Sequence, residues 1–164
     1  MSFQMTRFLV LAAIFGTAAA VLDQSVAVKG TLMCGDDPAA NVRVKLWEED
    51  GGPDPDDLLD QGYTKDDGSF ELSGGTAELT PIDPVFKVYH DCDDGVKPGA
   101  RKVVIYVPKS YITKGTDAKK TFNIGTINLE TTFGAEGREL VLSRHRREPD
   151  NYNFLDNLFA GVDF

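Results

Sequence analysis

The chain has 164 residues with 17 basic and 26 acidic side chains, a formal net charge of −9, and 41% hydrophobic residues. A negative protein repels nucleic acid and anionic membranes overall, so neither is expected as a general partner of its surface. The length and the hydrophobic fraction suit one ordinary domain that is large enough to bury its own core.

Residues 1–20 have the layout of a secretory signal peptide. Arg7 is their only charge, the apolar run 8–15 follows it, and small residues close the segment. The run is well short of the roughly 20 apolar residues that a membrane-spanning helix needs, and no later stretch of the chain supplies them. An N-terminal strand is disfavoured because the run does not alternate. We expect cleavage after Ala20, with cleavage after Ala18 or Ala19 as alternatives, and a secreted product.

Two alternating segments follow the signal peptide. In residues 25–34 apolar and polar side chains alternate along the sequence, so the apolar ones would share one face of a strand. This pattern is typical of a half-buried strand. Residues 42–47 alternate in the same way, and the turn-forming residues 35–38 separate the two segments. The pattern predicts the first two strands.

The stretch 48–57 is rich in glycine, proline and carboxylates, which predicts an exposed loop rather than a strand. Its acidic side chains also raise the hypothesis of a calcium site, because hard cations bind several carboxylate oxygens at once. Asp54, Asp56 and Leu58 do not match the spacing of a helix-loop-helix calcium loop. The sequence favours a solvated loop and leaves calcium as the alternative.

The rest of the chain contains further strand patterns. Residues 59–64 and 68–73 flank an Asp-Gly turn, so we expect them to pair as a hairpin, while residues 76–81 fit a short strand or a turn. Four later strands are expected, with a bulge at Gly125, at residues 85–92, 102–107, 121–129 and 139–143. With no convincing helix before residue 148, these strands predict an all-β sandwich of two antiparallel sheets.

Five runs occur in a characteristic order along the chain, beginning with Lys-Gly-Thr-Leu-Met-Cys, at residues 29–34, 42–49, 54–59, 82–92 and 125–129. Together they resemble the nematode transthyretin-like family over most of residues 26–143. The resemblance implies a secreted, transthyretin-like (prealbumin-like) antiparallel β-sandwich of about seven to eight strands. It indicates the fold better than the function, because most members of that family lack an established biochemical activity.

Cys34 and Cys92 are the only two cysteines. Each lies on the apolar parity at the end of a predicted strand, and secretion exposes both to an oxidising compartment, so a disulfide between them is predicted. It would close a loop of about 59 residues, worth roughly 4 kcal/mol in the chain-entropy model. Two buried thiols are the alternative. A zinc or thiol–base site with His90 is disfavoured because no fourth ligand is evident, and His90 is expected as a strand-end histidine.

The transthyretin fold also occurs in hydroxyisourate hydrolases, which use histidines, an arginine and a C-terminal Tyr-Arg-Gly-Ser signature. This chain lacks that signature and has only His90 and His145, so general acid–base catalysis has no evident source. A Gly-x-Ser-x-Gly elbow and a phosphate loop are also missing from the sequence. We expect no catalytic residue and no cofactor, with a hydrolase as a remote alternative.

The C-terminal part contains a basic cluster followed by an aromatic segment. Arg144, Arg146 and Arg147 form an Arg-x-Arg-Arg pattern that resembles proprotein-convertase sites, and a solvated strand end is the alternative. Cleavage after Arg147 would release residues 148–164. If this tail is retained, its helical spacing predicts a short docking helix or a disordered segment, with one apolar face formed by Leu155, Leu158, Phe159 and Val162.

The expected organisation is a signal peptide at 1–20, a sandwich domain at 21–147 and a tail at 148–164. The sequence predicts a secreted, non-enzymatic binding protein that carries a small apolar ligand or recognises a protein through loops at one end of the sandwich. The alternative is a cell-surface bridging protein that recognises a membrane lipid. No metal or nucleic acid is expected as a partner, and pairing of edge strands into a homo-oligomer is left open.

Overall fold

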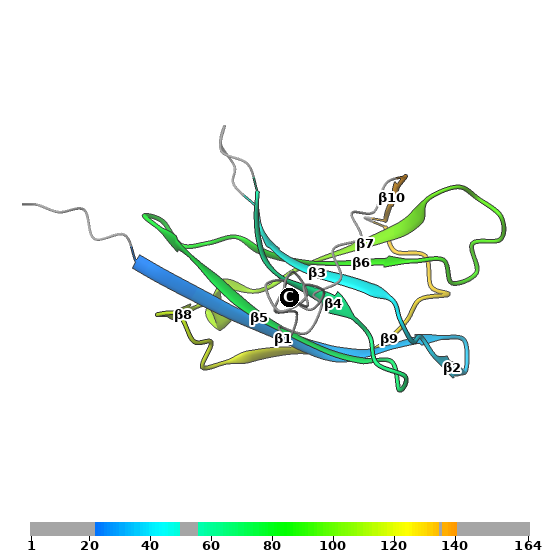
Figure 1. Cartoon of the computed structure of the whole chain (residues 1–164), viewed down its shortest axis with the longest axis horizontal. Coiled ribbons are helices and arrows are strands. Elements are labelled where there is room, and N and C mark those ends of the chain that lie inside the picture. The colour runs from blue at the N-terminus through cyan, green and yellow to red at the C-terminus, as the bar shows by residue number, and fades with distance from the viewer. Residues whose placement is uncertain (1–21, 50–55, 135, 141–164) are drawn as a thin grey trace, which may run out of the picture.

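The computed structural model describes residues 22–49, 56–134 and 136–140, which form two β-sheets packed face to face (Figure 1). Sheet A contains β1 (Leu22–Cys34), β2 (Asp37–Pro38), β5 (Ser69–Glu78), β8 (Thr113–Lys114) and β9 (Thr121–Asn128). Sheet B has the strand order β10 (Gly137–Glu139), β7 (Ala100–Tyr106), β6 (Pro84–His90), β3 (Arg43–Glu48) and β4 (Asp57–Tyr63).

The predicted all-β sandwich is confirmed. Seven of the described strands have six or more residues, and the helical content of these ranges is one 3-10 turn, η1 (Lys109–Tyr111). The ladders are antiparallel except between β1 and β9, which run parallel. This exception arises because the chain returns from sheet B through η1 and β8 and then follows β1 in the same direction (Figure 1).

The hairpin expected between residues 59–64 and 68–73 is wrong. β4 pairs with β3 in sheet B, whereas β5 pairs with β1 in sheet A. The tight turn itself is present, because the Gly68 N–H donates to the Lys65 carbonyl at 2.9 Å and the Lys65 N–H donates to the Ser69 carbonyl at 2.9 Å. The turn links two sheets instead of two paired strands, since each sheet needs the other to cover its apolar face.

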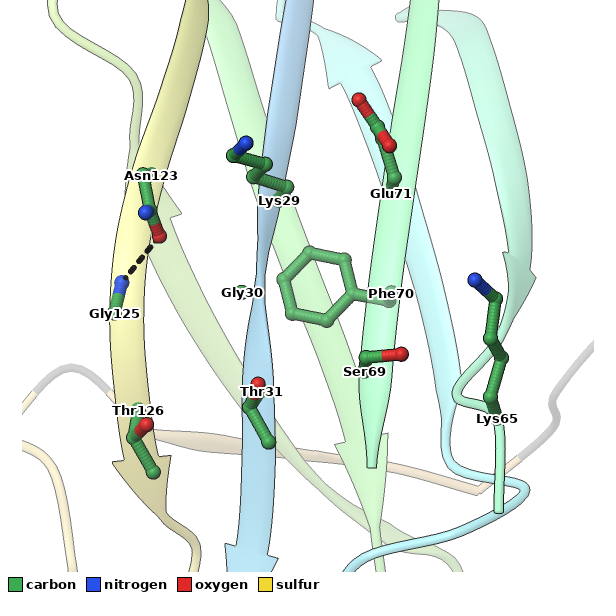
Figure 2. Close-up of a pocket in the computed structure, with 10 residues that line it drawn as sticks. All are labelled: Lys29, Gly30, Thr31, Lys65, Ser69, Phe70, Glu71, Asn123, Gly125 and Thr126. Carbon is green, nitrogen blue, oxygen red and sulfur yellow. Dashed lines mark hydrogen bonds between the residues drawn. The ribbon is translucent and has the colours of Figure 1, made fainter. Parts of the chain in front are cut away.

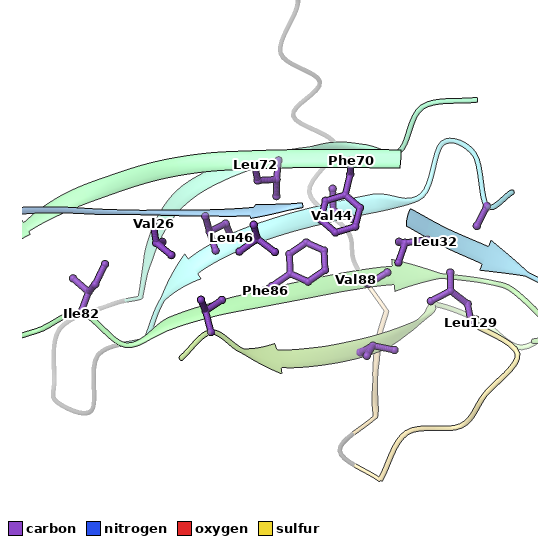
Figure 3. Close-up of a cluster of buried hydrophobic side chains, with 14 residues drawn as sticks. Val26, Leu32, Val44, Leu46, Phe70, Leu72, Ile82, Phe86, Val88 and Leu129 are labelled. Carbon is purple, nitrogen blue, oxygen red and sulfur yellow. The ribbon is translucent and has the colours of Figure 1, made fainter. Parts of the chain in front are cut away.

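The core lies between the two sheets (Figure 3). Phe70 from sheet A and Phe86 from sheet B stack across it with ring centroids 4.7 Å apart and planes inclined by 9°. Around this pair lie buried aliphatic side chains from both sheets, which include Val26, Val28, Leu32, Val44, Leu46, Leu72 and Val88. Burial of each such side chain contributes about 1.5–3 kcal/mol, so this layer holds the sheets together.

The bulge predicted at Gly125 is confirmed. The register of β1 against β9 shifts between Lys29 and Thr31, where two residues of β9 lie opposite Gly30. Gly125 is one of these two and has a φ of +70°. Its N–H donates to the Asn123 side chain at 2.9 Å, which holds the bulge in place.

The turn glycine Gly68 gives a first testable prediction. Its φ is +75°, and a Cβ at this position would lie 2.3 Å from the carbonyl oxygen of Leu32. We expect Gly68→Ala to lower the free energy of unfolding by about 2–3 kcal/mol in urea denaturation, through backbone strain and the close approach together. Gly125→Ala is the matched control, because Gly125 also has a positive φ but faces open space. Equal losses in the two variants would contradict the role of the Leu32 contact.

Candidate functional site

The structure joins Cys34 and Cys92 in a disulfide with Cα atoms 5.7 Å apart, as predicted. Cys34 is the last residue of β1 in sheet A. Cys92 lies two residues beyond the end of β6 in sheet B, so it follows the strand that was expected to include it. The bridge ties the two sheets together at one end of the sandwich, and it leaves neither sulfur free as a metal ligand or nucleophile.

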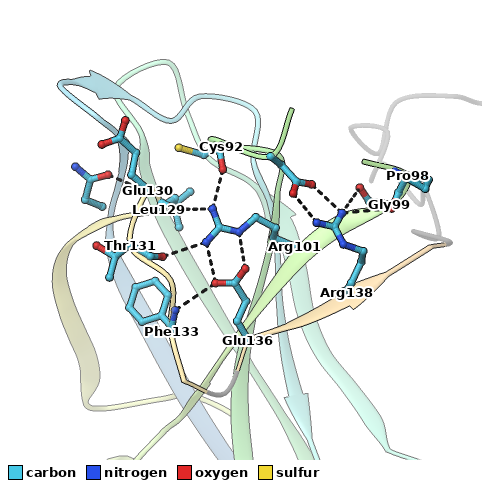
Figure 4. A network of polar contacts seen from close by, with 12 residues as sticks. Cys92, Pro98, Gly99, Arg101, Leu129, Glu130, Thr131, Phe133, Glu136 and Arg138 are labelled. Atoms are coloured by element: carbon cyan, nitrogen blue, oxygen red, sulfur yellow. Dashed lines mark hydrogen bonds and ion pairs between the residues drawn. The ribbon is translucent and has the colours of Figure 1, made fainter. Parts of the chain in front are cut away.

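A buried arginine lies beside the disulfide (Figure 4). Arg101 in β7 donates through Nη1 to the carbonyl oxygens of Cys92 at 2.8 Å and Leu129 at 3.1 Å. Nη2 donates to the Thr131 carbonyl at 3.2 Å and to the Glu136 carboxylate at 2.9 Å, and Nε donates to the other Glu136 oxygen. All five guanidinium hydrogens are used, so Arg101 holds the segment between β9 and β10 against β7.

A second ion pair closes the same end of the sandwich. Arg138 in β10 binds both carboxylate oxygens of Asp94, with Nη1 at 2.8 Å from Oδ2. Together with Arg101 and Glu136 this pair lines an open depression of about 440 Å³. Because both guanidinium groups already bind carboxylates of the same chain, the arrangement is a structural clasp rather than a vacant anion site.

His90 is the last residue of β6, which confirms it as a strand-end histidine. It is 3% exposed and lies opposite Arg101 in the sheet, and neither ring nitrogen has a hydrogen-bond partner within the described ranges. Burial first, and then the charge of Arg101, lower the pKa of His90. In the part of the chain that the structure describes, no group of three histidine, cysteine or carboxylate residues could hold a metal ion.

A shallow depression of about 390 Å³ lies on the outer face of sheet A, across β1, β5 and β9 (Figure 2). Polar side chains form most of its rim, among them Lys29, Thr31, Ser69, Glu71 and Asn123. Gly30 forms part of its floor, where a Cβ would meet the Ile124 side chain at 2.5 Å. The packing of Ile124 therefore explains this glycine, and the open polar surface does not suit a small apolar ligand.

The outer face of sheet B has different chemistry. In β3, Val44 and Leu46 point into the core, so the intervening side chains point away from it. The cross-strand register places further basic and aromatic residues of β4 and β6 beside them. We call this surface the basic–aromatic face, and it consists of Arg43, Lys45, Trp47, Tyr63, Lys87 and Tyr89.

Cations and aromatic rings alternate on the basic–aromatic face. Nζ of Lys45 lies 5.6 Å from the ring centroid of Trp47 and 5.3 Å from that of Tyr89. Nζ of Lys87 lies 5.5 Å from the Trp47 centroid. Cζ of Arg43 lies 4.8 Å from the Tyr63 centroid. Each such contact contributes about 0.5–1 kcal/mol at exposed sites and about 2 kcal/mol when desolvated, so the face is ordered before any partner binds.

The basic groups on this face are close enough to affect one another. Arg43 is 5% exposed and Lys45 is 6% exposed, although both lie on the outer side of the sheet. Burial, followed by the charges of Arg43 and Lys87, lowers the pKa of Lys45, while Glu139 opposes this shift. Burial, then Glu139, raises the pKa of Tyr89 to about 12.

Two further features shape recognition at this face. Lys87 forms ion pairs with Glu49 at 2.8 Å and Asp56 at 3.9 Å, at the edge formed by β4. The indole Nε1 of Trp47 is buried and has no hydrogen-bond partner among the described residues.

The sequence analysis did not identify the basic–aromatic face. The alternation of residues 42–47 already placed Arg43, Lys45 and Trp47 on one parity. What it could not supply was the sheet order, which brings β6 beside β3 and so places Lys87 next to Lys45. The same alternation in the strand around Lys87 was the signal that could have indicated a basic outer face.

Several predicted features lie outside the described residues and stay predictions. They comprise the signal peptide 1–20 with Ala20, most of the acidic loop at 50–55, the cluster Arg144, Arg146 and Arg147, and the tail 148–164. The structure therefore does not test signal cleavage, calcium binding by the loop, processing after Arg147 or a docking helix. Within the described ranges, no helix is long and apolar enough to cross a membrane.

The buried His90 predicts a specific pH dependence. Its pKa in the folded state is lowered, so below about pH 6.5 the unfolded chain takes up a proton that the folded chain does not. The free energy of unfolding should therefore fall on acidification, by up to about 1.4 kcal/mol per pH unit for one proton. His90→Leu should remove this dependence between pH 7.5 and 5.0 in urea denaturation.

The pH range from 7.5 to 5.0 separates the effect of His90 on stability from that of the neighbouring carboxylate, Glu136. The hydrogen bonds from Arg101 lower the pKa of Glu136 below 4.5, so stability from that ion pair is lost only at more acidic pH. Glu136→Gln is therefore the control, since it should weaken the fold throughout this pH range and, by removing a charge that raises the pKa of His90, should leave the acid response in place. An unchanged acid response in His90→Leu would contradict the assignment to His90.

Comparisons with known proteins agree with the architecture. The transthyretin-like family (TTR-52) matches residues 29–108. Transthyretin-like protein 46 of Caenorhabditis elegans is 67% identical over 150 residues, covering 91% of this chain and 84% of the relative. Transthyretin-like protein 33 of the same organism is 52% identical over 122 residues, covering 74% of this chain and 85% of the relative.

Among solved structures, a 9R-lipoxygenase from Cyanothece PCC8801 matches with a TM-score of 0.36 and 21% identity. That match covers 84% of this chain but only 21% of the lipoxygenase, and it is too weak to indicate a shared function. The two nematode relatives are similar over most of their length and most of this chain. The chain therefore belongs to the transthyretin-like family.

Proposed function

We propose that this chain is a secreted, non-enzymatic extracellular protein that recognises an acidic segment of a partner protein through the basic–aromatic face. The observation that carries the proposal is the cluster of Arg43, Lys45 and Lys87 among aromatic rings on one side of sheet B. Arginine, tryptophan and tyrosine are the residue types that dominate binding energy at protein interfaces.

The charge of this face contrasts with that of the whole chain. The net charge is −9, yet Arg43, Lys45 and Lys87 lie together here, with Glu49 and Asp56 already paired to Lys87. An acidic partner would compete with these carboxylates for Lys87. The aromatic rings would pack against apolar side chains of the same partner and exclude water from the ion pairs.

The geometry favours a surface partner over a small apolar ligand. The space between the sheets is filled by the core, including the stacked Phe70 and Phe86. The two depressions on sheet A and at the Arg101 clasp are open and lined largely by polar residues. Carriage of an apolar molecule would require an enclosed apolar pocket, which neither depression provides.

The non-enzymatic character is supported by the position of His90. Its side chain is only 3% exposed, so a molecule in solution would not reach it. Its lowered pKa keeps it neutral at physiological pH. Recognition of a membrane lipid is the second candidate, because the same cations would bind an anionic head group. The negative net charge of the chain opposes approach to an anionic bilayer, and this places the lipid second.

The proposal is tested with a synthetic peptide of alternating glutamate and tyrosine. The double variant Lys45→Met with Lys87→Gln should weaken binding of this peptide at least about tenfold in calorimetry, because each substitution removes a cation from the face. Lys29→Gln with Lys65→Gln is the control, since it removes the same charge from the outer side of sheet A. Binding is measured with and without residues 148–164, so that the tail does not determine the result.

Equal effects of the two double variants would overturn the proposal, because general electrostatic attraction would then explain the binding. Phosphatidylcholine vesicles with and without an anionic phospholipid form the second arm of the experiment. Vesicle binding that depends on Lys45 and Lys87, with no binding of the acidic peptide, would replace the protein partner by a lipid.

A further inference from the structure

His90 lies on the inner side of sheet B, at the end of the sandwich that the disulfide closes. It has the same parity in β6 as Phe86 and Val88, which belong to the core. Arg101 lies directly opposite it in β7, so both side chains start from the same side of the sheet. Among the described residues neither ring nitrogen of His90 has a hydrogen-bond partner, although the residue is only 3% exposed. The site therefore suits a neutral ring and not a charged one.

Charged groups reach His90 from three parts of the chain. Arg101 comes from β7, Asp91 and Asp94 come from the loop after β6, and Glu136 immediately precedes β10. A protonated His90 would lie opposite the Arg101 guanidinium group at the same buried end of the core. Like charges in a buried site disfavour each other, so any movement that takes Arg101 away and admits water favours the protonated ring.

The element that can move is the edge of sheet B, namely Glu136 and β10 (Gly137–Glu139), which we call the latch. Its ladder to β7 has three residue pairs. Two ion pairs add to this ladder, from Glu136 to Arg101 and from Arg138 to Asp94 (Figure 4). The latch residues are exposed or half-buried, and none belongs to the hydrophobic core cluster. A segment held mainly by polar contacts can open without global unfolding.

We propose that protonation of His90 opens the latch, so that this end of the sandwich is closed at neutral pH and open in acid while the core stays folded. In the open state Glu136 no longer binds Arg101, the guanidinium group turns toward solvent, and water reaches the imidazole ring. The proton comes from solvent and returns to it when the latch closes. The inference goes beyond the proposed function, because the basic–aromatic face takes no part in it.

The direction of the pH effect follows from the surroundings of His90. Burial and then the charge of Arg101 are the main causes of its lowered pKa, and opening of the latch relieves both. Glu136 acts in the opposite direction and is lost on opening, but Asp91 acts in that same direction and stays beside the ring in the chain. The open state thus binds the proton more tightly, and the open fraction rises as the pH falls below about 6.5.

The carboxylates of the latch ion pairs keep their charge in this pH range. The hydrogen bonds from Arg101 lower the pKa of Glu136 below 4.5. The hydrogen bonds from Arg138 lower the pKa of Asp94 below 3.8. Between pH 7.5 and 5.0 these carboxylates therefore stay ionised, and the proton that opens the latch is taken up by His90.

Hydrogen–deuterium exchange of the intact chain measures the opening. Exchange of the β10 amides is followed by mass spectrometry between pH 7.5 and 5.0, with each rate divided by the intrinsic rate at that pH. Protection of residues 137–139 should fall by up to roughly tenfold for each pH unit below about pH 6.5. Residues 85–88 of β6, in the core, should stay more strongly protected than β10 at every pH. In His90→Leu the protection of β10 should no longer depend on pH.

The reciprocal experiment measures the titration of His90 when the latch is weakened. Arg138→Gln removes the ion pair to Asp94, while Arg138 is not among the charges that shift the pKa of His90. Because linkage is reciprocal, NMR should show the His90 imidazole titrating about one pKa unit higher for each tenfold loss of β10 protection. Lys97→Gln is the matched control, since it removes an exposed cation from the same depression. It should leave both measurements unchanged.

Protection of β10 that stays constant from pH 7.5 to 5.0 would overturn the proposal, as would an equal fall in His90→Leu. Equal protection of β10 and of residues 85–88 at every pH would overturn it as well, because the chain would then open only by global unfolding. If His90→Leu does not fold, Arg138→Gln decides the question. Loss of β10 protection in Arg138→Gln without a shift in the His90 titration would show that the latch and His90 are independent.

Discussion

The disulfide between Cys34 and Cys92 is the constraint on which the arrangement of the two sheets depends. It joins the end of β1 to the chain just beyond β6, across a sequence separation of 58 residues. The main-chain carbonyl of Cys92 also accepts a hydrogen bond from Arg101, which in turn binds Glu136. One end of the sandwich is thereby held by a covalent bond and a buried ion pair together, and the opposing sheet faces stay in contact.

This rigid frame explains why the outer side of sheet B can present ordered cations. The stacked Phe70 and Phe86 and the aliphatic core occupy the inner faces, so alternation directs the remaining side chains of β3 and β6 outward. Arg43 and Lys45 are then held against aromatic rings instead of extending into water. Pre-ordered side chains lose less conformational entropy on binding, which suits a recognition surface.

Much of the fold could be predicted from the sequence, because alternation, turn residues and the Gly125 bulge are local signals. These signals placed the strands, and the position of both cysteines at predicted strand ends indicated the Cys34–Cys92 bridge. The partner of each strand could not be predicted: the Asp-Gly turn at Gly68 suggested a hairpin, yet β4 and β5 joined different sheets. Pairing depends on which apolar faces can cover each other, a contact between residues distant in sequence. The sequence by itself determined which side chains of β3 point outward, and only the tertiary structure decided that Lys87 and Tyr89 would lie beside them.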